Sequence, residues 1–333
     1  MGIAAFIRQT SLKQRSLFFL WTGALWLWPL PANLPADADP ARLTASYGEG
    51  LYKSQLTEAN SGLLGVRFFE SFEGQKNWNI RSEFAELHRD QKNYAYLRNV
   101  DADFYSGGTG KNVVHTKSDF GRSYLNKRRV ELEGNVIVRS QKGYRFMMDS
   151  LDYDGGPRLF HSDDLVQMVG PNALKPDMFL SGRGLDADLN QGGFVVRKNT
   201  RARRRLSNNE WLRVQSVRGE FFPDEDRAYF ERKVSAVLPN LTIYSDGLEM
   251  SMGAGGAEVL KAHGNVVLQQ KDRTGAAATA HILLGEDTII LEGNGVRDAT
   301  IIAPDVDMHG SKITLHTGDD RIEVEQAQGS IQR

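Results

Sequence analysis

The chain has 333 residues and no cysteine, and its 41 basic and 42 acidic side chains leave a net charge of −1 at pH 7. This balance argues against a nucleic-acid partner, and the lack of cysteine excludes disulfides, thiolate metal sites and a lipid-modified N-terminal cysteine. A hydrophobic content of 40% with 25% charged residues is ordinary for a folded body.

The N-terminus carries three basic residues before an apolar run from Leu17 to Leu30. Basic residues ahead of an apolar segment orient its N-terminal end toward the cytoplasm. The run is shorter than a full span of about 20 residues, and cleavable signal peptides have apolar regions of similar length. Three tryptophans in the run, and a cleavage-type site only at 36–38, favour a retained anchor over a cleaved signal.

The proline-rich stretch after this run is typical of an extended linker. We therefore expect a cytoplasmic N-terminus at 1–15, a single transmembrane anchor at 16–32 and a linker at 33–62, with the remainder exported.

From Leu63 onward, short alternating apolar runs are separated by Gly, Asn, Asp and Pro. No 3.6-residue periodicity is sustained, so strands are expected and helices should be few. The runs stack into eight similar units whose anchor positions lie 29 to 36 residues apart, each with two runs. Such a repeat predicts an all-β fold of about sixteen antiparallel strands.

A Gly-Asn pair recurs in matching surroundings, at Gly134-Asn135, Gly264-Asn265 and Gly293-Asn294. Gly and Asn are favoured in turns, and apolar β-branched residues follow the first two pairs. The motif is therefore interpreted as a turn that starts the returning strand of each unit. Val136 and Val138 should then point into the interior of the fold.

Inside several units, the apolar positions change from even to odd. Phe146 and Met148 are followed by Leu151 and Tyr153, and similar switches occur near 181–184, 245–247 and 310–311. Since side chains alternate between the two faces of a strand, a switch requires a bulge or a sharp bend. Bends repeated along one line predict two facing sheets in a V-shaped or jelly-roll slab, either one continuous slab or two jelly rolls.

Signals for an enzyme are poor. The segment 105–112 lacks the glycine spacing and the Ser or Thr of a phosphate-binding loop, so it is interpreted as a hairpin turn. The seven histidines show no metal-ligand spacing. We expect no catalytic residue, no metal and no cofactor.

The densest charge is the basic run from Arg197 to Arg205. A solvated strand edge is the favoured interpretation, because charge protects an edge from wrong pairing. The alternative is contact with an anionic partner through guanidinium groups, for which the candidates are Arg201, Arg203, Arg204 and Arg205.

Several segments resemble the LptC family of lipopolysaccharide-export proteins. They are Gly65-Val66-Arg67-Phe68, Glu133-Gly134-Asn135-Val136, Ser150 to Asp154 and Leu180 to Leu189. The resemblance covers roughly residues 17–205. Residues 210–333 are similar to an LptA or OstA-type module through Tyr244 to Met250 and Lys261 to Val266. It implies an LptC-like β-jelly-roll over 63–205 and an LptA/OstA-like extension over 206–333.

The resemblance also implies a function. Such a protein would sit in the inner membrane with its bulk in the periplasm, accept lipopolysaccharide from the LptB/LptF/LptG ABC transporter and pass it toward the outer membrane. It would join LptA or the outer-membrane LptD by edge-strand addition. Burial of acyl chains, at about 0.8 kcal/mol per methylene, needs apolar surface and no catalyst.

An apolar interior has two interpretations that the residues leave open, a packed core or an open lipid slot. Two other classes of function also remain, a membrane-anchored β-sheet sensor and a polysaccharide-processing β-solenoid enzyme. For the lipid slot, the expected inward residues are Val136, Val138, Phe146, Met148, Phe179, Leu185, Val266, Leu268 and Ile313.

Overall fold

The computed structural model describes residues 61–72, 74–88, 94–106, 113–124, 127–172, 174–252, 258–304, 306–319 and 321–331. The predicted cytoplasmic segment and transmembrane anchor, and nearly all of the linker, lie outside these residues. Within the described part of the chain, no helix is long and apolar enough to cross a membrane.

The described residues form an all-β, antiparallel fold, as predicted. The strands are β1 (Ser61–Phe72), β2 (Gln75–His88), β3 (Tyr94–Tyr105), β4 (Val113–Tyr124), β5 (Arg129–Arg139), β6 (Arg145–Asp154), β7 (Leu159–Gly170), β8 (Met178–Asp188), β9 (Gly193–Arg205), β10 (Trp211–Ser216), β11 (Arg218–Phe222), β12 (Arg227–Leu238), β13 (Leu241–Met252), β14 (Glu258–Gln270), β15 (Arg273–Leu283), β16 (Thr288–Glu292), β17 (Ala299–Ala303), β18 (Val306–Gly310), β19 (Lys312–His316), β20 (Arg321–Glu325) and β21 (Gln328–Ile331).

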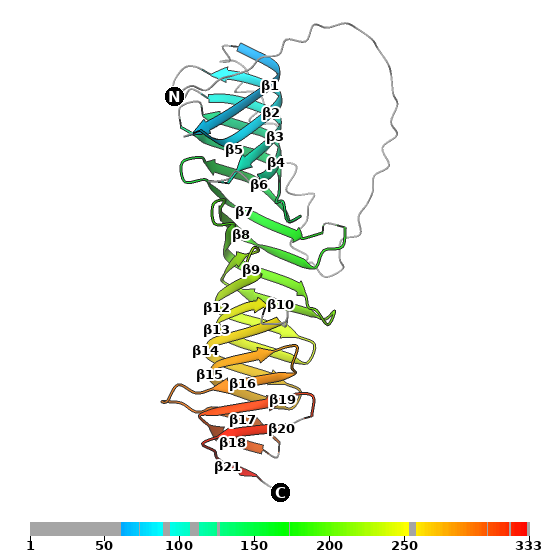
Figure 1. Ribbon diagram of the computed structural model, residues 1–333, viewed down its shortest axis with the longest axis vertical. Coiled ribbons are helices and arrows are strands. Elements are labelled where there is room, and N and C mark those ends of the chain that lie inside the picture. Colours follow the sequence, from blue (N-terminus) through cyan, green and yellow to red (C-terminus); the bar gives the residue numbers. More distant parts are fainter. Residues whose placement is uncertain are drawn as a thin grey trace.

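Consecutive strands pair in chain order and form one continuous sheet from β1 to β21 (Figure 1). Some neighbouring segments act as one interrupted strand. For example, β10 and β11 both pair with β9 on one side and β12 on the other. Counting β10/β11, β16/β17, β18/β19 and β20/β21 once each gives seventeen positions in the stack, against about sixteen expected. Because the pairing is continuous from β1 to β21, the described strands form one slab.

The sheet is folded along a line that crosses the middle of its strands. Register shifts lie on this line, for example between Glu133 and Val136 of β5 and between His263 and Val266 of β14. The predicted bends near 181–184 and 245–247 coincide with such shifts in β8 and β13. Repeated bulges thus fold one sheet into two facing layers.

The first two copies of the Gly-Asn motif lie on this line, which corrects the expectation of a turn before a strand, whereas Gly293-Asn294 lies in the connection between β16 and β17. Gly134 and Asn135 sit inside β5 with φ of 76° and 47°, and Gly264 and Asn265 sit inside β14 with 72° and 47°. The two left-handed residues form the bulge itself. Two residues of β5 lie in the bulge between Glu133 and Val136, so the inward positions of β5 stay at even numbers. One residue of β6 lies opposite them, so the inward positions of β6 change from even to odd.

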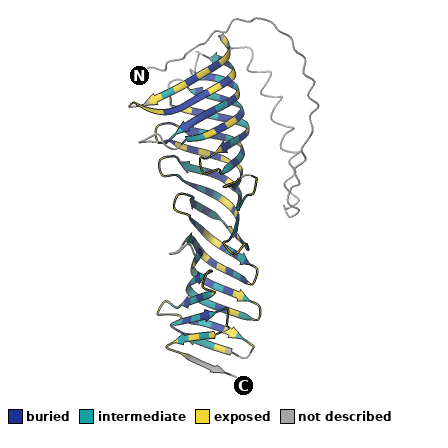
Figure 2. Ribbon diagram, turned by 45° about the vertical axis from the view of Figure 1, so that its right-hand side comes forward, coloured by how far each residue is buried: buried dark blue, intermediate teal, exposed yellow. Residues whose placement is uncertain are grey.

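We call the two layers wall 1 and wall 2. Wall 1 holds the strand halves that end at the turns 140–144, 171–177 and 206–210, and wall 2 those that end at 155–158, 189–192 and 223–226. Their inner faces pack against each other, as in the perpendicular contact of Phe146 with Phe194 at 5.0 Å between ring centroids. Alternate residues along most strands are buried (Figure 2). The side of the slab opposite the fold line is its mouth, where the tips of the walls meet.

Candidate functional site

An apolar cavity of about 260 Å³ lies between the walls at the mouth. Wall 1 lines it with Val138, Tyr144 and Phe146, and wall 2 with Leu185 and Phe194. These side chains are there because most inward positions of both walls are apolar. The cavity can therefore hold a hydrocarbon chain, since polar groups are confined to its rim.

The structure brings most of the predicted slot residues to the inner faces. Val136, Val138, Phe146, Met148, Leu185, Val266, Leu268 and Ile313 are all buried. Only three of them, Val138, Phe146 and Leu185, line the large cavity. Leu268 borders a second space of only about 10 Å³, so the interior near β14 is closely packed in this state.

Phe179 is the exception among the predicted slot residues. Its neighbour Leu180 is buried at 3% exposure, so alternation places Phe179 on the outer face of wall 1. There its ring lies 5.9 Å from that of Trp211. The two adjacent apolar residues were ambiguous in sequence, and Leu180 takes the inward position.

A polar strap crosses the mouth beside the cavity. The Lys142 ammonium, in the β5–β6 turn of wall 1, donates to the carbonyl of Pro223 at 3.0 Å and pairs with the Asp224 carboxylate at 2.7 Å. Both acceptors lie in the β11–β12 turn of wall 2. All three residues also line the cavity, so this Lys142 strap closes one end of its opening.

Further contacts cross the mouth on the N-terminal side of the cavity. The buried Arg158 guanidinium of wall 2 donates to the Tyr105 carbonyl of wall 1 at 3.2 Å. Asn77 donates to the Gly155 carbonyl at 3.0 Å. Glu70 pairs with Arg128 at 3.4 Å, and burial raises the pKa of the Glu70 carboxyl despite this arginine. The walls are thus joined more firmly here than at the Lys142 strap.

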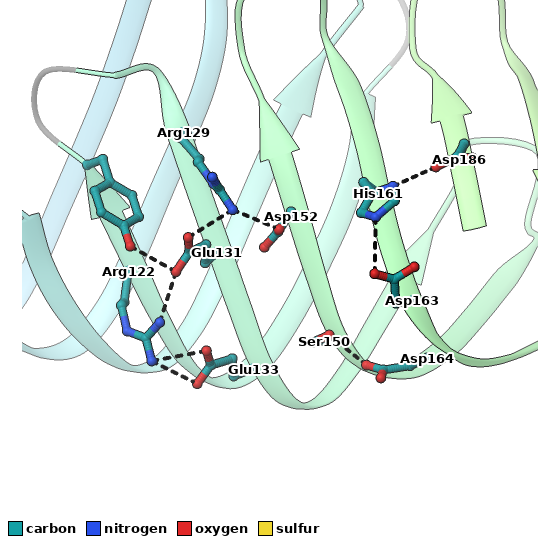
Figure 3. A network of polar contacts seen from close by, with 11 residues as sticks. Arg122, Arg129, Glu131, Glu133, Ser150, Asp152, His161, Asp163, Asp164 and Asp186 are labelled. Carbon is teal, nitrogen blue, oxygen red and sulfur yellow. Dashed lines mark hydrogen bonds and ion pairs between the residues drawn. The ribbon is translucent and has the colours of Figure 1, made fainter. Parts of the chain in front are cut away.

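The outer face of wall 2 carries a paired network of charges (Figure 3). Arg122 pairs with Glu131 at 2.9 Å, and Arg129 pairs with Asp152 at 2.9 Å. His161 lies 2.6 Å from Asp186. Opposite charges on neighbouring strands stabilise a sheet surface, so we interpret this network as structural.

The outer face of wall 1 carries ion pairs on β2 to β4, such as Lys117–Asp101 at 3.4 Å, but it differs from wall 2 between β5 and β10. A cross-strand row runs from Arg139 to Arg145, Val169, Phe179, Arg203 and Arg213. None of its four arginines has an ion pair with a described residue, and Arg201 beside them has none either. Arg203 stacks on Trp211 at 4.0 Å, and burial and the nearby Arg213 lower its pKa.

The four arginines predicted to meet an anionic partner separate into two pairs. Arg201 and Arg203 lie on this outer face. Arg204 contacts Glu258 at 3.8 Å across the mouth, and the Arg205 Nε donates to Asp177 at 2.7 Å. Only the first pair makes no ion pair with a described carboxylate.

No group of three or more His, Asp or Glu residues in the described ranges could hold a metal ion. Sequence reasoning missed Lys142, Asp224 and Arg158, which are ordinary charged residues in turns. The only signal for them is their position at the tips of the walls, and this becomes visible once the strands are paired.

Comparison with protein families gives two consecutive matches. Residues 70–205 match the family described as lipopolysaccharide-assembly, LptC-related, and residues 213–321 match the family of LptA and LptD N-terminal-domain lipopolysaccharide-transport proteins. Comparison with curated protein sequences gives no match.

Fourteen chains of solved structures match. One is LptH from Pseudomonas aeruginosa, described as the LptA-homologous periplasmic component of the lipopolysaccharide transport device. It is 15% identical, with a TM-score of 0.33, and the match covers 37% of this chain and 95% of LptH.

Proposed function

We propose that this protein is a component of the periplasmic bridge of lipopolysaccharide transport, because one chain joins an LptC-related segment to an LptA-like segment. We further propose that the acyl chains travel between its two walls. The observation that carries this proposal is the apolar cavity at the mouth of a slab whose inner face continues into the second segment. Val136, Val138, Phe146, Met148, Leu185, Val266, Leu268 and Ile313 are the proposed acyl contacts.

Loading requires the walls to separate, because the cavity is smaller than the roughly 300–1,000 Å³ of typical small-molecule pockets. An exposed ion pair such as Lys142–Asp224 contributes only about 0–1 kcal/mol. Each methylene that leaves water gains about 0.8 kcal/mol. Burial of two or three methylenes therefore offsets the loss of the Lys142 strap.

The remaining parts of the proposal concern partners. The segment 16–32 anchors the protein in the inner membrane, and the LptB/LptF/LptG transporter delivers the lipid to the first segment and supplies the energy. β1 pairs only with β2, and β20 only with β19, among the described strands. Both ends thus offer a strand edge, to which the transporter on one side and LptA or LptD on the other would add strands.

The arginines on the outer face of wall 1 suit an anionic partner. Arginine forks recognise carboxylates and phosphates through paired hydrogen bonds, and no described carboxylate pairs with Arg201 or Arg203. The two matched families are described as lipopolysaccharide assembly and transport proteins, so the proposed function is lipid transport without catalysis.

A photo-crosslinker placed by alternation tests the path of the lipid. Substitution at Val138 and Leu268 puts the probe inside the slab, while Ile137 and Val267 put it one residue away on the outside. We expect lipopolysaccharide adducts at the inner positions only. Equal capture inside and outside, or capture outside alone, would refute transport between the walls.

A further inference from the structure

The Lys142 strap presents a cation to an apolar cavity. Among the described residues that line the cavity, Lys142 is the single cation, and Asp188 and Asp224 are the acids. Asp188 already accepts hydrogen bonds from the backbone of Asn190 and Gln191, at 2.7 and 3.2 Å. Lys142 and Asp224 are thus the charged pair that can rearrange.

We propose that Lys142 exchanges Asp224 for a phosphate on the headgroup of the incoming lipid, so that Lys142 selects phosphorylated lipids. This inference rests on the proposed function and deepens it. The ligand is an amphiphile whose acyl chain enters the cavity while its phosphate stays at the mouth.

The geometry supports such an exchange. An ammonium has three donors, and two of them are used by Pro223 and Asp224. No described residue takes the third, which can meet a phosphate oxygen while the strap is still formed. The side chains of Lys142 and Asp224 are 50% and 53% exposed, so a headgroup can reach them from solvent.

Charge then drives the change of partner. A phosphate held at Lys142 lies beside the Asp224 carboxylate, and the two anions repel each other. Lys142 remains with the phosphate, because the acyl chain holds the headgroup in place. The contact between the tips of the walls is lost, and the mouth opens as the lipid enters.

The test uses the full chain in nanodiscs and two fluorescent probes, phosphorylated lipid A and its dephosphorylated form. Lys142→Gln should weaken binding of the phosphorylated lipid about fivefold, as expected for one exposed ion pair, and leave the other lipid unchanged. Asp224→Asn should not weaken either lipid. Lys142→Arg should restore the preference.

The control is Lys175→Gln, which removes an exposed lysine from another turn of wall 1 that does not line the cavity. If Lys142→Gln changes both lipids alike, or if Asp224→Asn weakens binding as Lys142→Gln does, the proposal is wrong and Lys142 only holds the walls. If the wild-type chain binds neither lipid, the proposed function fails together with it.

Discussion

At the scale of single residues, two copies of one hydrogen bond hold the fold line. Asn135 donates to Asp119 on the neighbouring strand at 2.7 Å, and Asn265 donates to Asp246 at the same distance. In each case the preceding glycine leaves room for the aspartate. The repeated motif therefore stabilises the bulge between the walls, while the proposed acyl contacts are residues that follow it.

Replacement of these glycines should weaken the fold. At Gly134 a Cβ would lie 3.0 Å from Asp119 Oδ2, and at Gly264 a Cβ would lie 2.7 Å from Asp246 Oδ2, both with positive φ. We expect Gly134→Ala and Gly264→Ala each to lower the free energy of unfolding by about 1–2 kcal/mol. Gly318→Ala, which has nothing closer than 3.9 Å, is the control for denaturant titration. Equal stability of all three variants would contradict the role of the bulge.

Glu70 gives a prediction about pH. Burial raises its pKa, so between the ordinary and the raised value the folded state binds more protons than the unfolded state. The contribution of Glu70 to stability must then fall as pH rises through this window. Glu70→Gln removes this pH dependence. The free energy of unfolding of the variant minus that of the wild type should therefore increase from pH 4 to pH 7. A difference that stays flat or has the opposite sign would show that Arg128 outweighs burial.

At the scale of elements, the tips of the walls decide access to the interior. Lys142 and Pro223 are 81 positions apart in sequence, and they meet because strands far apart in the stack face each other across the mouth. The cavity lies between this strap and the contacts of Arg158. Opening of the slab should therefore begin at the β5–β6 and β11–β12 turns.

A covalent strap tests this. The chain has no cysteine, so Lys142→Cys with Asp224→Cys gives the only two thiols, which a cleavable bis-maleimide can join. We expect the joined protein to lose most lipopolysaccharide loading and to regain it after cleavage of the linker. Each single variant with the same reagent is the control. Unchanged loading of the joined protein would place lipid entry elsewhere.

Much of this architecture was predictable from alternation. The switches of parity near 148–151 and 245–247 located the fold line, because a bulge shifts every following side chain to the other face. The role of Gly134-Asn135 was not predictable, since turns and bulges both favour left-handed glycine and asparagine. The Lys142 strap was not predictable either, because no local sequence pattern shows which turns of the two walls face each other.

At the scale of the whole molecule, the two walls differ in charge between β5 and β10, whereas β2 to β4 of wall 1 carry ion pairs such as Lys117–Asp101. Wall 2 balances its surface with ion pairs (Figure 3), whereas wall 1 places Arg203 directly opposite Arg213 and Arg139 opposite Arg145. Like charges at facing positions destabilise a sheet. This arrangement fits a face whose charge is neutralised by a partner during transport.

The arginine row should therefore separate stability from function. We expect Arg203→Gln with Arg213→Gln to keep or raise the free energy of unfolding, by up to about 1 kcal/mol, because repulsion is removed, while transport in cells falls. Arg218→Gln on wall 2 breaks the pairs with Glu220 and Glu231. It should lower the free energy of unfolding and leave transport in cells intact. Normal transport by the double variant would show that the arginine row binds no partner that transport requires.

We propose that lipopolysaccharide passes between the walls from the first segment into the second. Time-resolved photo-crosslinking in energised vesicles, with probes at Val138 and Leu268 of otherwise identical chains, measures this passage directly. We expect adducts at Val138 to appear first and those at Leu268 to follow, and both to require ATP. Adducts at Leu268 that precede those at Val138, or that form when the path through Val138 is blocked, would contradict this proposal.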